Sequence, residues 1–213
     1  MGTHQSGASG SVKEMSHTNN ALIVFSRNPI LGKVKTRIAK SCGDKKALEI
    51  YQKLIQINEQ TISNLTEIKT FIFYDKNIDN QVYKKIINKE KQEGVTLGEK
   101  MLNAFNCIKK KGYKNIIIIG NDCPYITVSL LQNAFENLKK NDYVIGPTYD
   151  GGYYLLGMKK INKHLFIKKE WSTESVFEDT IKDIKKDDKN LFILKKLEDI
   201  DYYENWITFK NKN

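Results

Sequence analysis

The stretch NIIIIGNDCP, residues 115–124, decides the fold. Four consecutive isoleucines are apolar on every side, which is typical of a strand buried on both faces of a parallel sheet. Gly120 ends the run, and Asp122 follows it. Because ligands of such sheets bind outside the carboxyl ends of the strands, the stretch predicts a central strand with a carboxylate at the ligand edge.

Outward from this strand, strand-like and helix-like segments alternate along the chain. Apolar or β-branched runs predict further strands over 21–25, 69–75, 142–147, 152–158 and 191–194. Apolar residues at helical spacing predict helices over 44–65, 82–89, 96–108, 127–139, 172–184 and 201–209. The four residues 148–151 are too few for a parallel crossover, so the strands that flank them are expected to be antiparallel.

The alternation predicts one α/β domain over residues 21–209, with a mostly parallel central sheet and helices on both faces. Thr96 and Glu99 form a capping-box pattern, after which Leu97 and the apolar residues of the next three turns are expected on the inner helix face. Thr127 and Ser172 are the expected N-caps of later helices. Residues 1–20 are polar and rich in Gly and Ser, which predicts a disordered leader or a cloning remnant.

Bulk composition narrows the possible partners. The 213 residues carry 35 Lys and Arg against 25 Asp and Glu, a formal net charge of +10. The excess favours anionic partners, although a solvated lysine-rich surface explains it equally well. Three scattered cysteines without a CxxC pattern argue against a zinc site and favour reduced thiols in the cytoplasm. No apolar run approaches the ~20 residues of a membrane span, and no secretory signal stands at the N-terminus.

The loop SRNPILGKVKTR, residues 26–37, follows the first predicted strand. It carries four cations and a turn-forming glycine: Arg27, Gly32, Lys33, Lys35 and Arg37. In an extended loop the cations at 33, 35 and 37 would point the same way, as a clamp for a pyrophosphate requires. The pattern matches neither a Walker A loop nor GxGxxG. The alternative is a solvated loop with several lysines.

Carboxylates near the ends of two segments are candidate metal ligands. Asp122 suits Mg²⁺ or Mn²⁺ bridged to a nucleotide phosphate, because these ions prefer hard oxygen ligands. The alternative role of Asp122 as a helix cap is weakened by Thr127, which already fills that place. Asp199 and Asp201 precede the last predicted helix; one of them is expected to cap it and the other to reach the metal, and spacing does not decide which.

The stretch GPTYDGGYYLLG, residues 146–157, and the nearby Trp171 form the remaining candidates. Asp150 stands before Gly151 and Gly152, where a backbone without side chains can approach a ligand closely. Asp-Gly is also a common hairpin turn, and both interpretations can hold together. Trp171 stands at a helix entry, where it forms either a hydrophobic staple or a platform for an acceptor.

Taken as an ordered set, six segments resemble a known family: FSRNPILGKVKTR, TLGEKM, IIGNDCP, GPTYDGGYYLLG, EWSTESV and LEDIDYYENW. It is the glycosyltransferase-like family of GT-A-fold proteins, formerly a domain of unknown function (DUF2064-type). The family is related in fold to the nucleotidyltransferases of molybdopterin and phospholactate-type substrates. The resemblance covers the chain from Ala21 to Trp206 and implies a single-domain, Rossmann-like nucleotide-diphospho-sugar transferase fold.

The resemblance also implies roles for individual residues. The basic loop would hold the diphosphate, and Asp122 falls at the family's single-carboxylate metal motif. Asp201 falls where related nucleotidyltransferases have a second metal ligand. Gly98 and Glu99 match the segment beside the nucleotide. Tyr202 and its neighbour replace the Thr-Pro that the family typically has after the last aspartate.

Together these features predict a metal-dependent transferase, with Mg²⁺ or Mn²⁺ as cofactor, that moves a sugar from a nucleotide-sugar to a small acceptor. Lys35 and Arg37 would stabilise the leaving diphosphate, and Asp150 would act as the base. The alternative is a nucleotidyltransferase that uses an NTP and releases pyrophosphate, although the loop lacks the GxG turn of those enzymes. A nucleic-acid binder is a third hypothesis, and no arrangement of aromatic and basic residues supports it.

Overall fold

The computed structural model describes residues 18–212, so most of the predicted leader lies outside the described part. Seven strands form one sheet: β1 (Asn20–Ser26), β2 (Lys69–Tyr74), β3 (Lys89–Lys91), β4 (Asn115–Ile119), β5 (Tyr143–Pro147), β6 (Tyr153–Met158) and β7 (Leu191–Ile193). The helices are α1 (Thr36–Ser63), α2 (Leu97–Lys110), α3 (Val128–Lys140), α4 (Val176–Lys186), α5 (Tyr203–Lys212) and a 3-10 helix, η1 (Lys163–Leu165).

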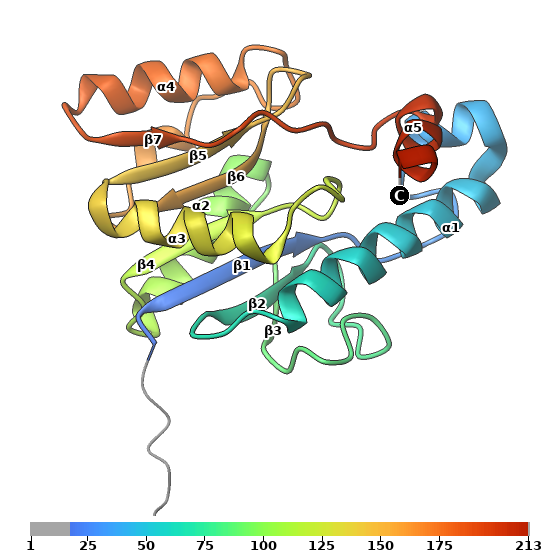
Figure 1. Cartoon of the computed structure of the whole chain (residues 1–213), viewed down its shortest axis with the longest axis horizontal. Coiled ribbons are helices and arrows are strands. Elements are labelled where there is room, and N and C mark those ends of the chain that lie inside the picture. The colour runs from blue at the N-terminus through green and yellow to red at the C-terminus, as the bar shows by residue number, and fades with distance from the viewer. Residues whose placement is uncertain (1–17, 213) are drawn as a thin grey trace, which may run out of the picture.

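The strand order is β3-β2-β1-β4-β6-β5-β7, which makes β4 the central strand, as its four isoleucines predict (Figure 1). β6 runs antiparallel to both of its neighbours, and the other strand pairs are parallel. The short connection between β5 and β6 therefore forms the expected antiparallel pair. The sheet is mostly parallel, and the predicted α/β class is confirmed.

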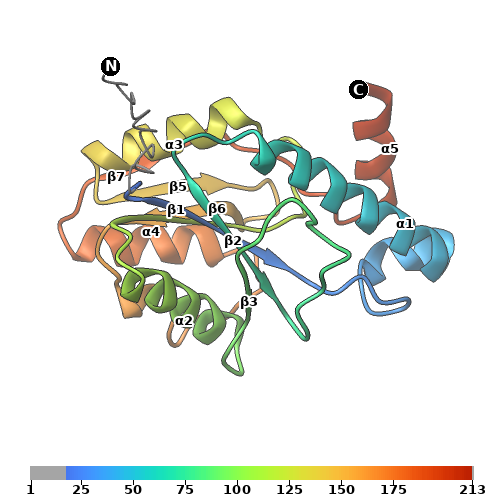
Figure 2. The same ribbon diagram turned by 90° about the horizontal axis from the view of Figure 1, so that it is seen from below.

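Helices cover both faces of the sheet (Figure 2). One face packs against α1 and α3, with Ile117 and Ile119 of β4 in that core. The other face packs against α2 and α4, with Ile116 and Ile118 in the second core. All four isoleucines are at most 3% exposed. Alternate side chains of one strand thus enter two cores, which explains why the run is apolar without alternation.

A third apolar cluster joins α5 to α1 on both sides of Gly43, at the carboxyl end of β1 (Figure 1). Gly43 interrupts α1 with a φ of 80°, and the two parts of the helix meet there at a kink. Ile38, Leu54 and Trp206 are among the buried residues that hold α5 against α1. This packing fixes the start of α1, and with it the end of the basic loop, beside the segment that leads into α5.

Several helix predictions are wrong in part. No helix forms over residues 82–89: residues 82–85 form bends and turns, and Lys89 begins β3. Tyr83 adopts a φ of 50° and buries its ring completely, which is incompatible with a helix there. Helix α1 begins at Thr36, eight residues before the predicted start. Leu97 is 42% exposed rather than inward, because it occupies the first helical position. Ser172 lies in a turn with a φ of 66°, and α4 begins only at Val176.

Two predicted helix starts are confirmed. The Thr96 hydroxyl accepts a hydrogen bond from the Glu99 N–H, and the Glu99 carboxylate accepts one from the Thr96 N–H, both at 3.2 Å. Thr127 accepts from the Leu130 N–H, also at 3.2 Å, and so caps α3. None of the helices within residues 18–212 combines the length and the apolar character that crossing a bilayer demands.

Candidate active site

The candidate site lies where the carboxyl ends of β1 and β4 are neighbours. The chain passes from β1 to β2 on one side of the sheet and later returns to β4 on the other side, so the strand order reverses between β1 and β4. A crevice outside the strand ends forms at such a switch point. The basic loop follows β1 and Asp122 follows β4, so the topology brings these two predicted site segments together.

A buried polar network joins the two segments. The Asn121 amide, only 5% exposed, donates toward the Ser26 hydroxyl at 3.2 Å and the Tyr51 hydroxyl at 3.1 Å, and lies 3.4 Å from the Tyr83 hydroxyl. The Tyr51 hydroxyl accepts from the Arg27 N–H at 2.9 Å and donates to the Arg27 carbonyl at 3.0 Å. Burial raises the pKa of Tyr51, so the hydroxyl stays neutral and can donate. Asn121 thereby couples the loop after β4 to the loop after β1.

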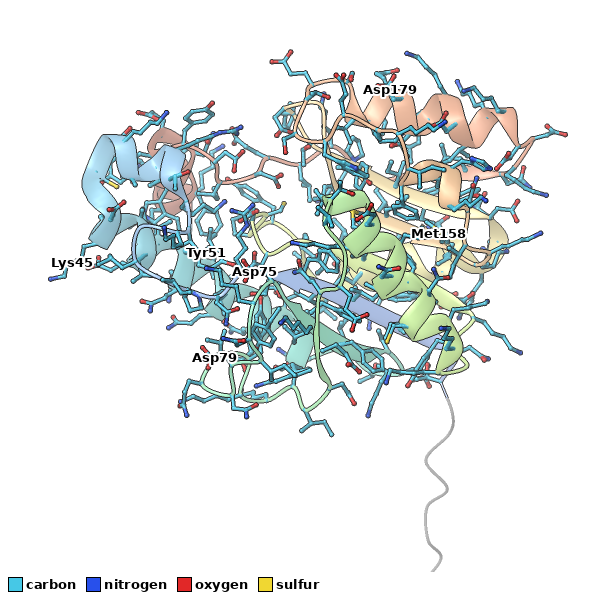
Figure 3. All side chains as sticks on the ribbon, turned by 180° about the vertical axis from the view of Figure 1, so that it is seen from behind. Lys45, Tyr51, Asp75, Asp79, Met158 and Asp179 are labelled. Carbon is cyan, nitrogen blue, oxygen red and sulfur yellow. The ribbon has the colours of Figure 1, made fainter. Side chains whose placement is uncertain are left out.

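Asn28, the next residue of the basic loop, is held by residues that directly follow β2. The Asp75 carboxylate accepts from the Asn28 N–H at 2.8 Å, and Figure 3 labels Asp75 together with Tyr51. The Asn28 side-chain oxygen in turn accepts from the N–H groups of Lys76 and Asn77, both at 3.2 Å. The loop therefore leaves β1 in a fixed direction, which a preorganised anion site requires.

Replacing Asn121 with alanine is expected to lower the free energy of unfolding by about 2–3 kcal/mol, because buried hydroxyls would lose their shared donor. Urea titration monitored by circular dichroism measures the loss. Asn103→Ala is the matched control, since that exposed amide donates to the Glu93 carbonyl at 3.0 Å and joins no buried network. A loss no larger than that of the control would contradict the coupling role of Asn121.

Lys35 points into the site from the end of the basic loop. Its backbone adopts a φ of 47° directly before α1, and its side chain is 7% exposed. The Lys35 ammonium lies 2.6 Å from Oδ1 of Asp122, 3.4 Å from Oδ1 of Asp201 and 2.7 Å from the Ile200 carbonyl. Burial acts to lower the pKa of Lys35, but the Asp122 and Asp201 carboxylates outweigh burial and hold it above the ordinary value. Lys35 is therefore a buried, charged ammonium.

The other cations of the loop behave differently. Arg37 donates to Oδ2 of Asp201 at 2.8 Å and lies over the Tyr202 ring at 5.8 Å. Arg27 and Lys33 expose their side chains to solvent. The expectation that residues 33, 35 and 37 point the same way holds only for Lys35 and Arg37, which both reach the Asp201 carboxylate, whereas Lys33 is exposed. The run is not extended, because Lys35 has a left-handed backbone and helix α1 already includes Arg37.

Asp199 is a third carboxylate beside Asp122 and Asp201. The Ile200 N–H donates to the Asp122 carbonyl at 2.9 Å, which places the segment containing both aspartates against the end of β4. Asp199 is half-buried, and its Oδ1 is sealed from solvent and accepts no hydrogen bond within residues 18–212. Burial, together with the negative charges of Asp122 and Asp150, raises the pKa of Asp199 to about 8.

Spacing along the sequence left Asp199 and Asp201 without distinct roles, although the family resemblance implies Asp201 as a metal ligand; in the structure their surroundings differ. The Asp201 oxygens face Lys35 and Arg37, whereas Asp199 buries its Oδ1, which accepts no hydrogen bond within residues 18–212. An uncompensated buried carboxylate is costly to the fold, and such groups concentrate at functional sites. One signal in the sequence points to Asp199: in an extended Asp-Ile-Asp segment, alternate residues face the same side.

Asp199→Asn is expected to raise the free energy of unfolding by about 1–2 kcal/mol near pH 8. The neutral amide avoids the cost of ionising a half-buried carboxyl whose pKa is raised. A raised folded-state pKa means that the parent binds more protons when folded, so its stability falls as pH rises from about 4 toward 8. The difference in melting temperature between variant and parent should therefore widen over that range, measured with EDTA present. Asp201→Asn, which breaks ion pairs, should lower stability instead; equal pH profiles of Asp199→Asn and the parent would refute the prediction.

The predicted base, Asp150, belongs to the turn between β5 and β6. Its Oδ1 accepts from the Thr148 hydroxyl and, at 3.1 Å, from the Gly152 N–H. Gly151 adopts a φ of 87°, and its carbonyl accepts from the Phe177 N–H at 2.9 Å. The Asp-Gly turn interpretation is therefore confirmed. The negative charge of Asp150 also contributes to the raised pKa of Asp199.

Gly98 and Trp171 come together at the amino end of α2. A side chain at Gly98 would meet the Phe166 carbonyl at 2.0 Å and the Trp171 ring nitrogen at 2.7 Å. A hollow of about 310 Å³ opens beside them, lined by Thr96, Glu99, Trp171 and residues 166–170. The Glu99 carboxylate is committed to the helix cap, and its hydrogen bonds from Val95 and Thr96 lower its pKa.

The sequence model of one family, described as an uncharacterized protein conserved in bacteria (DUF2064), matches residues 59–173, more than half of the chain. The chain belongs to this family. The resemblance drawn from its motifs is confirmed.

The DUF2064 protein also resembles solved structures. A protein from Desulfovibrio desulfuricans G20, provisionally named a nucleotide-diphospho-sugar transferase, is 28% identical, with a TM-score of 0.84 over 92% of this chain and 89% of that one. More distant are CMP:2-keto-3-deoxy-manno-octonic acid synthetase in complex with CTP (7% identity, TM-score 0.59, 91% and 98% covered) and 4-diphosphocytidyl-2C-methyl-D-erythritol synthase from Anaerococcus prevotii DSM 20548 (13%, 0.59, 91% and 96%). The last two share the fold alone. No curated protein is a significant match.

The carboxylates of this DUF2064 protein suit a divalent cation in part. Within residues 18–212, no group of three or more His, Cys, Asp and Glu side chains is arranged so that it could hold a metal ion. Asp122 and Asp201 nevertheless converge on one ammonium, and the buried Oδ1 of Asp199, two residues before Asp201, has no hydrogen-bond partner within residues 18–212. An open set of carboxylates fits Mg²⁺ or Mn²⁺, because Mg²⁺ in particular keeps several waters or substrate phosphates among its ligands.

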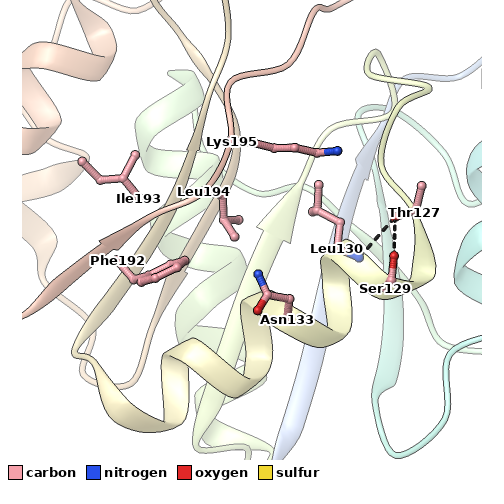
Figure 4. Close-up of a pocket in the computed structure, with 8 residues that line it drawn as sticks. All are labelled: Thr127, Ser129, Leu130, Asn133, Phe192, Ile193, Leu194 and Lys195. Atoms are coloured by element: carbon pink, nitrogen blue, oxygen red, sulfur yellow. Dashed lines mark hydrogen bonds between the residues drawn. The ribbon is translucent and has the colours of Figure 1, made fainter.

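A second hollow of the DUF2064 protein, about 330 Å³, lies between α3 and β7 (Figure 4). Thr127, Asn133, Phe192 and Lys195 are among its lining residues, and the Thr127 cap forms one end. None of the site residues predicted from sequence lines this hollow. It is separate from the cluster of cations and carboxylates.

Proposed function

We propose that the protein is a nucleotide-binding transferase that moves a sugar from a nucleotide-diphosphate donor to a small acceptor. The observation that carries the proposal is the meeting of the basic loop with Asp122 and Asp201 at the β1–β4 switch point. Switch points of open α/β sheets are where such folds bind their ligands. The name of the relative from Desulfovibrio desulfuricans supports the same substrate class.

The loop cations would bind and stabilise the diphosphate. Arg27 and Lys33 are exposed on the loop, and Arg37 lies at the start of α1, so all three can meet an anion that enters from solvent. Their charge is most useful as the bond to the sugar breaks, because negative charge then builds on the leaving diphosphate. The Tyr51 and Asp75 contacts hold the backbone of this loop, so the charges need little reorganisation.

Asp122, Asp201 and Asp199 would hold Mg²⁺ or Mn²⁺. Such an ion, when bound, supplies neutralising charge to the phosphates. Asp122 and Asp201 are 46% and 30% exposed in their side chains, so both reach the crevice as well as Lys35. Asp199 lies deeper and would be the ligand whose unpaired oxygen is satisfied by the ion.

The acceptor would enter along the β5–β6 turn. Asp150 would accept the proton of the acceptor hydroxyl through Oδ2, because Oδ1 is engaged by Thr148 and Gly152. Gly151 and Gly152 leave backbone accessible at this edge. Trp171 and the hollow beside it offer an apolar platform with polar rims, which suits the ring of a sugar or a base.

A nucleotidyltransferase is the second candidate. Two of the structural neighbours carry names that denote cytidylyl transfer, and one of them binds CTP. The same loop cations and carboxylates would suit a triphosphate, with pyrophosphate as the leaving group. The two candidates differ in which nucleotide binds and in which phosphate bond breaks.

Nucleic acid is not among the partners we propose. Several lysines that contribute to the charge of +10 pair with acids one turn away on the same helix, including Lys46 with Glu49, Lys139 with Glu136 and Lys182 with Asp179. Such pairs are typical of solvated helix faces. They support the surface explanation of the excess charge rather than a continuous basic stripe.

A ligand panel tests the proposal. The melting temperature of the parent is measured with NTPs, NDPs and NDP-sugars, each with and without Mn²⁺, and reactions are then analysed for free NDP or pyrophosphate. We expect one NDP-sugar to raise the melting temperature in a Mn²⁺-dependent manner and then to release NDP. A rise in melting temperature with a triphosphate alone, together with pyrophosphate release, would establish the second candidate. An unchanged melting temperature with every nucleotide would refute both candidates.

A further inference from the structure

We infer that the Lys35 ammonium is the resident cation of the carboxylate cluster, so that a divalent ion enters only by displacing it toward the phosphates of the substrate. This inference deepens the proposed function and rests on it for the identity of the phosphate ligand. Lys35 and a divalent ion compete for the same oxygens, and that competition can be measured without any turnover.

The contacts of Lys35 are those that a divalent ion would make. Its ammonium is surrounded by three oxygens: Oδ1 of Asp122 at 2.6 Å, the Ile200 carbonyl at 2.7 Å and Oδ1 of Asp201 at 3.4 Å. Carboxylate and carbonyl oxygens are the ligands that hard divalent ions prefer. An ammonium and a divalent ion repel each other and cannot share these oxygens. The ion therefore binds only when Lys35 withdraws.

The difference in exposure between Lys35 and the two carboxylates leaves a path for displacement. The Lys35 side chain is 7% exposed, whereas the side chains of Asp122 and Asp201 are 46% and 30% exposed. A ligand can approach the carboxylates from that open side. Lys35 lies at the junction of loop and helix with a φ of 47°, and its four-carbon stem can swing the charge outward. The phosphates that accompany the ion supply the new partner for the ammonium.

Displacement makes metal and phosphate binding mutually dependent. A divalent ion alone must expel a buried ammonium that then has no anion to pair with. A phosphate-bearing ligand that arrives with the ion offers that anion, so each ligand strengthens the binding of the other. The resident lysine also keeps the close carboxylates neutralised when no substrate is bound, which removes part of the repulsion between them.

The test measures Mn²⁺ binding in the absence of nucleotide, from the electron paramagnetic resonance signal of the free ion. Lys35→Met removes the competing charge and keeps a stem of similar length. We expect Lys35→Met to bind Mn²⁺ at least about tenfold more tightly than the parent. Lys35→Arg keeps a cation and should stay at the level of the parent. Lys40→Met, which removes an exposed charge from the same helix, should also stay there.

Adding Asp122→Asn to Lys35→Met should abolish the gain, which places the ion at the cluster. Equal affinity of the parent and Lys35→Met would overturn the inference. Should Lys35→Met not fold, the parent decides: Mn²⁺ binding by the parent alone at about 10 µM or tighter, lost in Asp122→Asn, would overturn it. A gain in Lys35→Met without any nucleotide effect in the ligand panel would support the resident cation and refute the proposed function, so the two fail separately.

Discussion

Asp122→Asn is expected to lower turnover by at least ~10²-fold and to abolish the Mn²⁺-dependent rise in melting temperature on nucleotide binding. Asp122 is the carboxylate at the end of the central strand and the closest acidic partner of Lys35, at 2.6 Å. The amide keeps the size of the side chain and removes the charge that holds both the resident ammonium and the ion that would replace it.

The folded state should survive this change, because Lys35 retains Asp201 and the Ile200 carbonyl as partners. The melting temperature without ligands separates loss of function from loss of fold. Asp142→Asn is the matched control: it removes an equivalent charge just before β5, at the opposite edge of the sheet, where the carboxylate accepts from the Asn190 N–H. Turnover by Asp122→Asn at the level of the control would rule out a catalytic role for Asp122.

Gly151→Ala is expected to lower the free energy of unfolding by about 3–5 kcal/mol, the largest loss among the stability variants considered. Gly151 has a φ of 87°, and a Cβ there would lie 2.0 Å from the Glu174 carbonyl. The obstacle is backbone, so no rotation of a side chain relieves it. The turn that carries Asp150 and the segment that leads into α4 would have to separate.

Gly112→Ala measures the conformational part of this effect, so the difference between the two variants isolates the steric part. Gly112 also has a positive φ, 95°, but a Cβ there meets nothing within 4 Å. Its expected loss is only about 1 kcal/mol, the conformational cost by itself. Chemical denaturation of both variants measures the difference. Equal losses would mean that the Gly151 turn moves away from Glu174 without cost, and that the turn does not fix the place of Asp150.

Much of the fold follows from local pattern. The isoleucine run of β4 predicts a strand buried on both faces, and the two cores receive its side chains in alternation. The short connection after β5 predicts an antiparallel pair, and the capping signals at Thr96 and Thr127 mark true helix starts. These features depend on residues a few positions apart, so composition and spacing express them directly.

The misplaced elements share another cause. A helical pattern over 82–89 gives way to turns because Tyr83 buries its ring and lies within hydrogen-bonding distance of the Asn58 side chain, on a helix 25 positions away. Ser172 has the chemistry of a cap, yet the helix begins four residues later, where residues 173–177 meet the Gly151 turn. Tertiary packing overrides local preference at both places.

The sequence by itself determined the class of the sheet, its central strand, the loops at its carboxyl edge and most of the charged residues gathered there. Which of these charges meet was decided by tertiary structure alone. Lys35 turns inward because α5 packs on α1 and brings Asp201 against the end of β4, across more than 160 positions of sequence. The unpaired oxygen of Asp199 and the shared amide of Asn121 likewise exist only where distant segments converge. Hydrogen bonds and ion pairs act over a few ångströms in space, and spacing along the chain does not encode such distances.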